Sequence, residues 1–135
     1  MKQIQQDIAQ AIRERRRFTS GNAKGSGYAR RDGLTGNRDY LGWDVINNSG
    51  EFRYELWGNV IARGNAQDKS IQVSTCGYNT PTTVSRLNAI FAGFEIPMAV
   101  IVRKDKAIFS KDGKEIDGIP YGAHLIAGDW DVLIL

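Results

Sequence analysis

The sequence predicts an α+β domain in which an antiparallel β-sheet of about five strands is packed by an N-terminal helix and a central helix. Apolar residues recur with helical spacing near the N-terminus and again in the middle of the chain. Over most of the remainder they alternate with polar residues, which is the pattern of half-buried strands. A chain of 135 residues has the usual length of one domain, so residues 1–135 are expected to form a single core.

The first predicted element is an amphipathic helix within residues 1–19. Ile4, Ile8, Ala11 and Ile12 fall on one stripe at helical spacing. Basic residues follow in the last turn, where cations complement the negative end of the helix dipole. We therefore expect the apolar stripe of this helix to pack on the sheet.

A long basic loop is predicted over residues 20–39, because Gly, Asn and Arg dominate this stretch. One short strand is expected around Tyr28. Residues 1–38 carry nine basic and three acidic side chains, whereas the rest of the chain carries nine basic and twelve acidic ones. Such asymmetry is typical of a surface for nucleic acid or an acidic partner, although a solvated helix end and loop explain it equally.

Residues 40–135 are expected to hold the sheet together with the central helix. Between residues 40 and 75 the apolar period is two, which predicts three strands of an antiparallel meander. Gly58 is expected to mark a β-bulge. The residues predicted on the apolar face of these strands are Leu41, Trp43, Val45, Phe52, Tyr54, Leu56, Ile71 and Val73.

The central helix is predicted from about Thr82 to Phe94, where apolar residues return to helical spacing. Either Thr80 or Thr82 is expected to cap it, with Pro81 near the first turn. Tyr78 is expected to pack against the helix as a hydrophobic staple.

The C-terminal part of the chain predicts further strands. Residues 98–102 and 107–109 are apolar runs joined by a charged turn, and the dipeptide Asp112-Gly113 is a strong signal for a tight hairpin. A final strand is predicted close to the C-terminus, where apolar residues alternate again.

The stretch STCGYNTPTT, residues 74–83, joins a strand to the central helix and allows two interpretations. In the first, its glycine, proline and threonines only form the turn and the cap. In the second, the helix start is a candidate anion site, where backbone amides and the hydroxyls of Thr82 and Thr83 join Arg86 in holding a phosphate or carboxylate. A P-loop is excluded because the GxxxxGK pattern is absent.

The longer run STCGYNTPTTVSRLN resembles a pattern of many small uncharacterised bacteriophage and plasmid proteins. In those proteins a strand is followed by Thr-x-Gly-aromatic-x-Thr-x-Thr-Thr-x-x-Arg-hydrophobic-Asn. The matching residues here are Thr75, Gly77, Tyr78, Thr80, Thr82, Thr83, Arg86, Leu87 and Asn88. The runs FTSGNAKG and, more loosely, LWGNVIA are similar to other segments of the same proteins. The resemblance implies a mobile-element origin and transfers no activity.

Residue counts exclude several kinds of chemistry. His124 is the only histidine and Cys76 the only cysteine, so a structural zinc site and two-histidine hydrolase chemistry are excluded, and neither a metal nor a cofactor is expected. A Cys76/His124 nucleophile pair stays open, although an inert cysteine and a surface histidine explain the same residues. Asp129 and Asp131 are expected to be ordinary polar residues on the outward face of the final strand.

The sequence therefore favours a protein that acts by binding and is not an enzyme. The first hypothesis is a phage or mobile-element accessory protein that binds and inhibits or modulates a host or defence protein complex, as an anti-CRISPR-like inhibitor does. The alternative is a nucleic-acid-binding protein that uses its basic N-terminal third on DNA or RNA phosphates. The residues expected to make these contacts are Arg13, Arg15, Arg16, Arg17, Lys24, Tyr28, Arg30, Arg31 and Arg38.

The expected location is the cytoplasm of the bacterial host, without a membrane partner. No apolar run approaches the roughly 20 residues of a membrane span, and the polar N-terminus lacks the apolar segment of a secretory signal. A single cysteine rules out an internal disulfide, which agrees with a reducing compartment.

Overall fold

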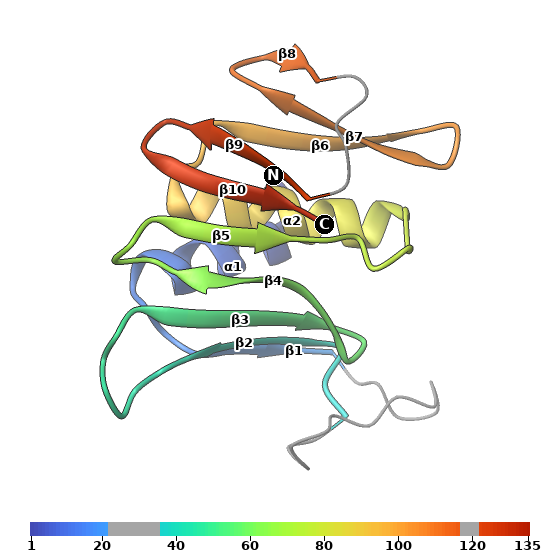
Figure 1. The fold of residues 1–135 in the computed structure, drawn as a ribbon. Helices are drawn as coiled ribbons and strands as arrows, with labels where there is room; N and C mark the ends of the chain where they lie inside the picture. The colour runs from blue at the N-terminus through green and yellow to red at the C-terminus, as the bar shows by residue number, and fades with distance from the viewer. Residues whose placement is uncertain (22–35, 117–121) are drawn as a thin grey trace.

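The computed structural model describes residues 1–21, 36–116 and 122–135 (Figure 1). In these residues the chain forms two helices, a seven-stranded sheet and a three-stranded sheet, referred to below as the large and the small sheet. The α+β class is confirmed, and so is the presence of both predicted helices. The first is shorter than the predicted range of 1–19, because it ends at Arg13 and residues 18–20 form a strand. The prediction of about five antiparallel strands is wrong, because the large sheet alone has seven strands and is mixed.

The large sheet has the strand order β1-β2-β3-β4-β5-β10-β9. Its strands are β1 (Phe18–Ser20), β2 (Asp39–Trp43), β3 (Glu51–Leu56), β4 (Asn59–Asn65), β5 (Ser70–Val73), β9 (Ala123–Ala127) and β10 (Trp130–Ile134). The predicted antiparallel meander is confirmed, but its three expected strands are four, β2 to β5, because the chain reverses at Trp57 and Gly58. β10 pairs parallel to β5, because the chain between these two strands crosses over and returns in the same direction.

Two helices, α1 (Gln3–Arg13) and α2 (Pro81–Phe94), lie on one side of the large sheet (Figure 1). The predicted stripe of α1 is confirmed, since Ile8, Ala11 and Ile12 are buried in the core. A Cβ atom on Gly93 of α2 would lie 2.9 Å from the Cβ atom of Ile12. The glycine therefore permits the two helices to cross in close contact.

Thr80 is the cap of α2. Its backbone is extended, its Oγ1 accepts a hydrogen bond from the backbone N–H of Thr83 at 3.3 Å, and Pro81 follows in the first turn. Of the two predicted caps, Thr80 is confirmed and Thr82 is wrong. The staple predicted for Tyr78 is also wrong: the residue lies two positions before the cap and its side chain is about half exposed.

The small sheet has the order β6-β7-β8 and consists of β6 (Met98–Arg103), β7 (Lys106–Lys111) and β8 (Lys114–Glu115). The predicted strands and the Asp112-Gly113 hairpin are confirmed. Asn88 of α2 fixes β6, because its side-chain amide donates to the carbonyl of Val100 at 2.8 Å and accepts from the N–H of Val100 at 2.7 Å. The amide thereby satisfies backbone groups that an edge strand would otherwise leave unpaired.

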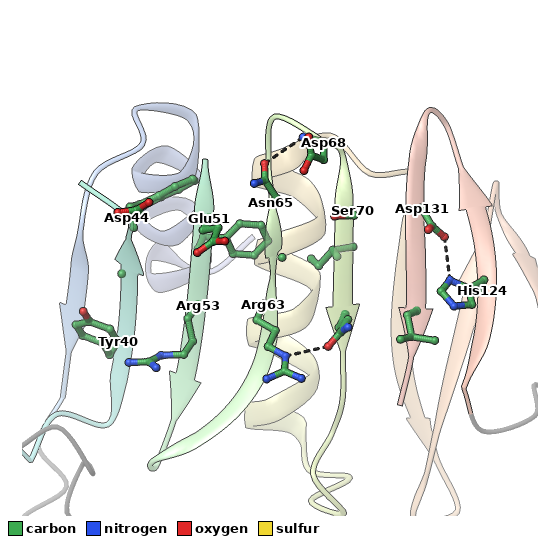
Figure 2. A pocket seen from close by; sticks show the side chains of 17 residues that line it. Tyr40, Asp44, Glu51, Arg53, Arg63, Asn65, Asp68, Ser70, His124 and Asp131 are labelled. Atoms are coloured by element: carbon green, nitrogen blue, oxygen red, sulfur yellow. Dashed lines mark hydrogen bonds and ion pairs between the residues drawn. The ribbon is translucent and has the colours of Figure 1, made fainter. Parts of the chain in front are cut away.

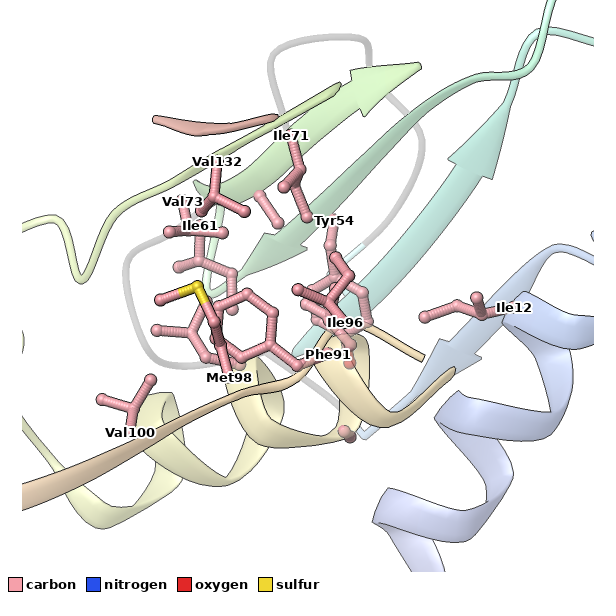
Figure 3. Packing of buried hydrophobic residues seen from close by; sticks show 14 of the residues in the cluster. Ile12, Tyr54, Ile61, Ile71, Val73, Phe91, Ile96, Met98, Val100 and Val132 are labelled. Atoms are coloured by element: carbon pink, nitrogen blue, oxygen red, sulfur yellow. The ribbon is translucent and has the colours of Figure 1, made fainter. Parts of the chain in front are cut away.

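The hydrophobic core lies between the large sheet and the two helices, with β6 closing one end (Figure 3). In Figure 3, Tyr54 and Ile61 from the sheet point toward Phe91 of α2, and Met98 lies beside them. The face predicted for the meander is confirmed for Leu41, Phe52, Tyr54, Leu56, Ile71 and Val73, and Trp43 is partly buried against it.

Two predictions within the meander are wrong. Val45 is 82 % exposed, because β2 ends at Trp43 and the chain has already entered a loop. Gly58 does not mark a bulge: Trp57 and Gly58 have φ angles of 53° and 79° and form the tight turn between β3 and β4. The irregularity in register lies between Tyr54 and Glu55.

Most of the predicted loop at 20–39 lies outside the described residues, and so does the strand expected around Tyr28. Its first and last residues, Ser20 and Asp39, belong to the paired strands β1 and β2. None of the helices in the described ranges is long and apolar enough to cross a membrane.

Candidate binding face

The face of the large sheet turned away from α1 and α2 carries no further layer in the described part of the chain (Figure 1). A groove of about 690 Å³ runs across this open face (Figure 2). Alternate residues of the strands line it, because successive side chains of a strand point to opposite faces of the sheet. The alternation that buries one set of side chains thus places the polar set in the groove.

Cross-strand register arranges these side chains in two rows with different charges. The first row contains Arg53, Arg63, Gln72, Leu133 and His124. The second contains Glu51, Asn65, Ser70 and Asp131, with Asp44 and Asp68 beyond the ends of their strands. In the groove as a whole, two arginines stand beside four carboxylates. The excess of carboxylates disfavours the binding of a phosphate backbone.

Hydrogen bonds fix several of the groove side chains. Arg63 Nε donates to Gln72 Oε1 at 2.8 Å, and His124 Nδ1 lies 3.2 Å from Asp131 Oδ1 (Figure 2). Both members of the His124–Asp131 pair are at least half exposed. The groove is therefore a polar surface on which these two pairs of side chains are held by hydrogen bonds.

The loop between β2 and β3 stands at one end of the groove and exposes two aliphatic side chains. Val45 is 82 % and Ile46 is 90 % exposed. The carboxylate of Asp44 holds this loop, because it accepts hydrogen bonds from the N–H groups of Ile46 and Asn47, both at 3.2 Å, and from the hydroxyl of Ser49 at 2.8 Å. These bonds, that of Ser49 foremost, lower the pKa of Asp44. The Val45–Ile46 tip is thus apolar, exposed and fixed.

A buried ionic cluster surrounds Asp39 at the start of β2. Arg86 Nε lies 2.8 Å from Asp39 Oδ1, Arg38 Nε lies 2.7 Å from Oδ2, and the hydroxyl of Tyr54 donates to Oδ1 at 2.7 Å. Burial and, next, the charge of Asp39 raise the pKa of Tyr54 well above its ordinary value. Arg86, which we expected at an anion site with Thr82 and Thr83, is buried and paired with an internal carboxylate.

Of the residues predicted to contact a partner, only some lie close to one another in the described structure. Arg13, Arg15, Arg16 and Arg17 are exposed at and after the end of α1, and Arg38 belongs to the ionic cluster. Arg16 pairs with Glu14 at 2.9 Å, and the guanidinium of Arg17 lies 5.6 Å from the ring centroid of Tyr40, which lines the groove. The remaining predicted residues, Lys24, Tyr28, Arg30 and Arg31, lie outside the described residues.

The side chains that the sequence offered for chemistry have other contacts in the described residues. The described ranges contain no group of three or more His, Cys, Asp or Glu side chains that would hold a metal ion. Cys76 is exposed and its thiol donates to the carbonyl of Val60 at 3.3 Å, whereas His124 pairs with Asp131.

When the sequence is compared with models of known protein families, one family matches it. The model of the Kyanoviridae Gp96 protein family matches residues 43–129. The chain belongs to this family of phage proteins. No curated protein and no solved structure matches it. The phage origin implied by the sequence resemblance is confirmed, and the matched segment contains the Val45–Ile46 tip together with β3, β4 and β5.

Sequence reasoning missed the Val45–Ile46 tip and the role of Asp39. Val45 continues the alternation of β2, so its exposure follows only from where the strand ends. The turn residues Asn47, Asn48, Ser49 and Gly50 were the available signal for that end. No local pattern in the sequence indicates that Asp39 is buried in an ion pair, because its partner Arg86 is distant in the sequence.

Proposed function

We propose that this phage protein is a non-catalytic accessory protein that binds a host or defence protein and inhibits or modulates it, as an anti-CRISPR-like inhibitor does. Binding takes place on the open face of the large sheet, with the Val45–Ile46 tip as the apolar anchor and the groove as the polar part of the interface. The cytoplasm of the bacterial host is the compartment in which such a partner would be met.

The exposure of the Val45–Ile46 tip carries this proposal. Two neighbouring β-branched residues at 82 % and 90 % exposure leave apolar surface in water, and packing on the described residues does not cover it. The hydrogen bonds to Asp44 hold the tip in one conformation, so little entropy would be lost on binding. A fixed apolar anchor beside polar side chains has the composition of a protein interface, with an apolar centre and a polar rim.

The charges of the groove support a protein partner over a nucleic acid. The rows of opposite charge would orient a partner that carries complementary charges, because like charges across an interface are costly. Binding of DNA or RNA remains the second candidate, and the exposed arginines Arg13, Arg15, Arg16 and Arg17 favour it. This alternative requires an affinity that falls steeply with salt concentration.

The proposal is tested by capture from a lysate of the phage's host with three forms of the tagged protein. The wild type and a control variant, Ile101→Ser on β6, should retain the same stoichiometric protein partner, because Ile101 is a half-exposed aliphatic residue of the small sheet. The double variant V45S/I46S should retain at least about tenfold less, since burial of each aliphatic side chain contributes about 1.5 kcal/mol or more. Quantitative mass spectrometry measures the ratio.

Two results would contradict this function. Equal capture by V45S/I46S and the wild type would show that the tip is no anchor. Co-purification of nucleic acid, seen in the absorbance ratio and lost with Arg13→Glu and Arg17→Glu, would favour the second candidate instead.

A further inference from the structure

A second pocket, of about 410 Å³, lies at the start of α2 and shares no lining residue with the groove on the open face. Two segments distant in sequence form it. The β3–β4 hairpin contributes Leu56, Trp57, Asn59 and Ile61, and the segment leading into α2 contributes Thr75, Tyr78, Thr80, Thr82 and Thr83. The volume lies within the range of about 300–1,000 Å³ that small-ligand sites occupy.

The pocket accounts for the polar part of the run STCGYNTPTTVSRLN. The later residues of this run have structural roles: Arg86 pairs with Asp39, Leu87 is buried in the core, and Asn88 binds β6. The threonines and the tyrosine that precede them surround the pocket instead. The run therefore has a pocket-lining half and a structural half. Within the pocket-lining half, Thr80 and Thr83 also form the cap of α2, whereas capping does not explain Thr75, Tyr78 and Thr82.

The described lining of the pocket is apolar and uncharged. Leu56 and Ile61 are buried side chains of the wall, and Trp57 and Tyr78 add aromatic rings. None of the nine described lining residues is ionisable near neutral pH. A charged occupant would lose hydration here without gaining a counter-charge, since Arg86 of the same helix is neutralised by Asp39 inside the core. The lining therefore selects an uncharged occupant.

The polar groups of the pocket are neutral donors and acceptors. Within the described residues, the hydroxyls of Thr75 and Thr82 form no hydrogen bond, whereas that of Thr80 caps α2. Asn59 Nδ2 reaches the carbonyl of Trp57 at 3.5 Å, which is a long contact, and its Oδ1 accepts no bond from a described residue. Hydroxyl and amide groups around aromatic rings match the edge of a nitrogen heterocycle, which presents donors and acceptors in the plane of its ring.

Backbone and side-chain hydrogen bonds fix both walls of the pocket. The N–H of Trp57 donates to the carbonyl of Arg38 at 2.8 Å, and the N–H of Tyr78 donates to the carbonyl of Thr75 at 2.9 Å. Asn79 Nδ2 donates to the carbonyl of Asp105 at 3.0 Å and ties the segment before α2 to the β6–β7 turn. A ligand would therefore meet a largely preformed site, which lowers the entropic cost of binding.

We propose that this pocket binds an uncharged nucleobase, which stacks on an aromatic ring of the lining and is read at its edge by threonine hydroxyls and the Asn59 amide. The base is supplied either by a free nucleoside or by a single-stranded nucleic acid. Both sources present the same planar, neutral heterocycle to the pocket, and base stacking on aromatic side chains is the usual basis of such recognition. This site is separate from the proposed protein-binding face and does not depend on it.

Two arms of one experiment distinguish the sources. In the first, the five common nucleosides are titrated into the full chain, and saturation-transfer NMR and tryptophan fluorescence report binding. In the second, single-stranded oligonucleotides of about ten nucleotides are used, because strand-binding sites span about 4–16 nucleotides. We expect saturable binding in at least one arm. The variant T75V/T82V removes two hydroxyls at nearly constant shape and should weaken binding at least about tenfold.

The control is Thr19→Val, which removes an exposed threonine hydroxyl on β1 and should leave the affinity unchanged. Saturable binding of nucleosides identifies a site for the free ligand, and binding of oligonucleotides alone identifies a site for a strand. Absence of binding in both arms overturns the proposal, and so does binding that T75V/T82V leaves intact. It is also overturned if N-acetyltryptophanamide binds while every nucleoside and oligonucleotide fails, because the pocket then accepts an aromatic side chain.

Discussion

The carboxylate of Asp39 is fully buried and is held by Arg86, Arg38 and the hydroxyl of Tyr54. A buried carboxylate without partners would be strongly unfavourable. Each of the three partners therefore stabilises the fold chiefly because its removal would leave the charge of Asp39 less compensated. The cluster ties the start of β2 to α2 and to β3, three elements that local sequence patterns do not connect. At the scale of single residues, Arg86 is therefore a structural residue of the fold.

Tyr54 should make stability sensitive to alkaline pH. Its pKa is raised in the folded state by burial and by Asp39, so the unfolded chain loses the phenol proton first as the pH rises. The stabilisation is complete below the ordinary pKa of about 10 and is lost progressively above it. Urea unfolding of the wild type between neutral pH and pH 11 should therefore show a decline that begins near pH 10.

Tyr54→Phe is the matched variant for this prediction, because it removes only the hydroxyl and leaves the ring in the core. At neutral pH it should cost about 2 kcal/mol, because the lost hydrogen bond is to the buried carboxylate of Asp39. Above pH 10 its free energy of unfolding should fall less steeply than that of the wild type. Parallel curves for the two proteins would show that the pKa of Tyr54 is the same in the folded and the unfolded state, which would contradict this prediction.

At the scale of elements, the sequence predicts what local periodicity determines. The strands β2 to β5 and both helices follow from alternation or helical spacing within short windows. The parallel pairing of β10 with β5 did not follow, because Val132 and Ile71 are brought together only after the intervening chain has crossed the sheet. The tip was missed for a similar reason: the pattern of Leu41 and Trp43 extends to Val45, and only the three-dimensional course of the loop removes Val45 from the sheet.

Asn88 should control the attachment of the small sheet to α2. Asn88→Ala removes both hydrogen bonds to the backbone of Val100 and should lower the free energy of unfolding by about 2 kcal/mol. Asn88→Asp keeps an acceptor for the N–H of Val100 but places a carboxylate oxygen against its carbonyl. Hydrogen exchange of the Val100 amide should therefore accelerate strongly in N88A and less in N88D. Equal protection in all three proteins would show that β6 is held by its apolar contacts alone.

At the scale of the whole molecule, the two faces of the large sheet have different roles, because one is buried and the other is exposed. The helices and β6 bury one face and supply most of the apolar contacts, so the opposite face is free to carry charged side chains in two rows. The binding pocket that we infer lies at the edge of this arrangement, where the β3–β4 turn meets the start of α2. The Val45–Ile46 tip lies outside the hydrophobic core, which is why V45S/I46S should leave the fold intact.

The segment matched by the phage family, residues 43–129, should not fold by itself. It lacks α1, whose Ile8 and Ile12 are buried, and it lacks β10, which stands between β5 and β9 and contributes Val132. Loss of a central strand and a covering helix would leave β9 unpaired and the face of α2 that packs on α1 in water. The isolated segment should show no cooperative urea transition and poorly dispersed amide resonances, whereas residues 3–135, which retain every helix and strand, should unfold like the full chain. A cooperative transition in the 43–129 segment would mean that α2 and the strands β3 to β9 bury enough apolar surface to offset the entropy of folding.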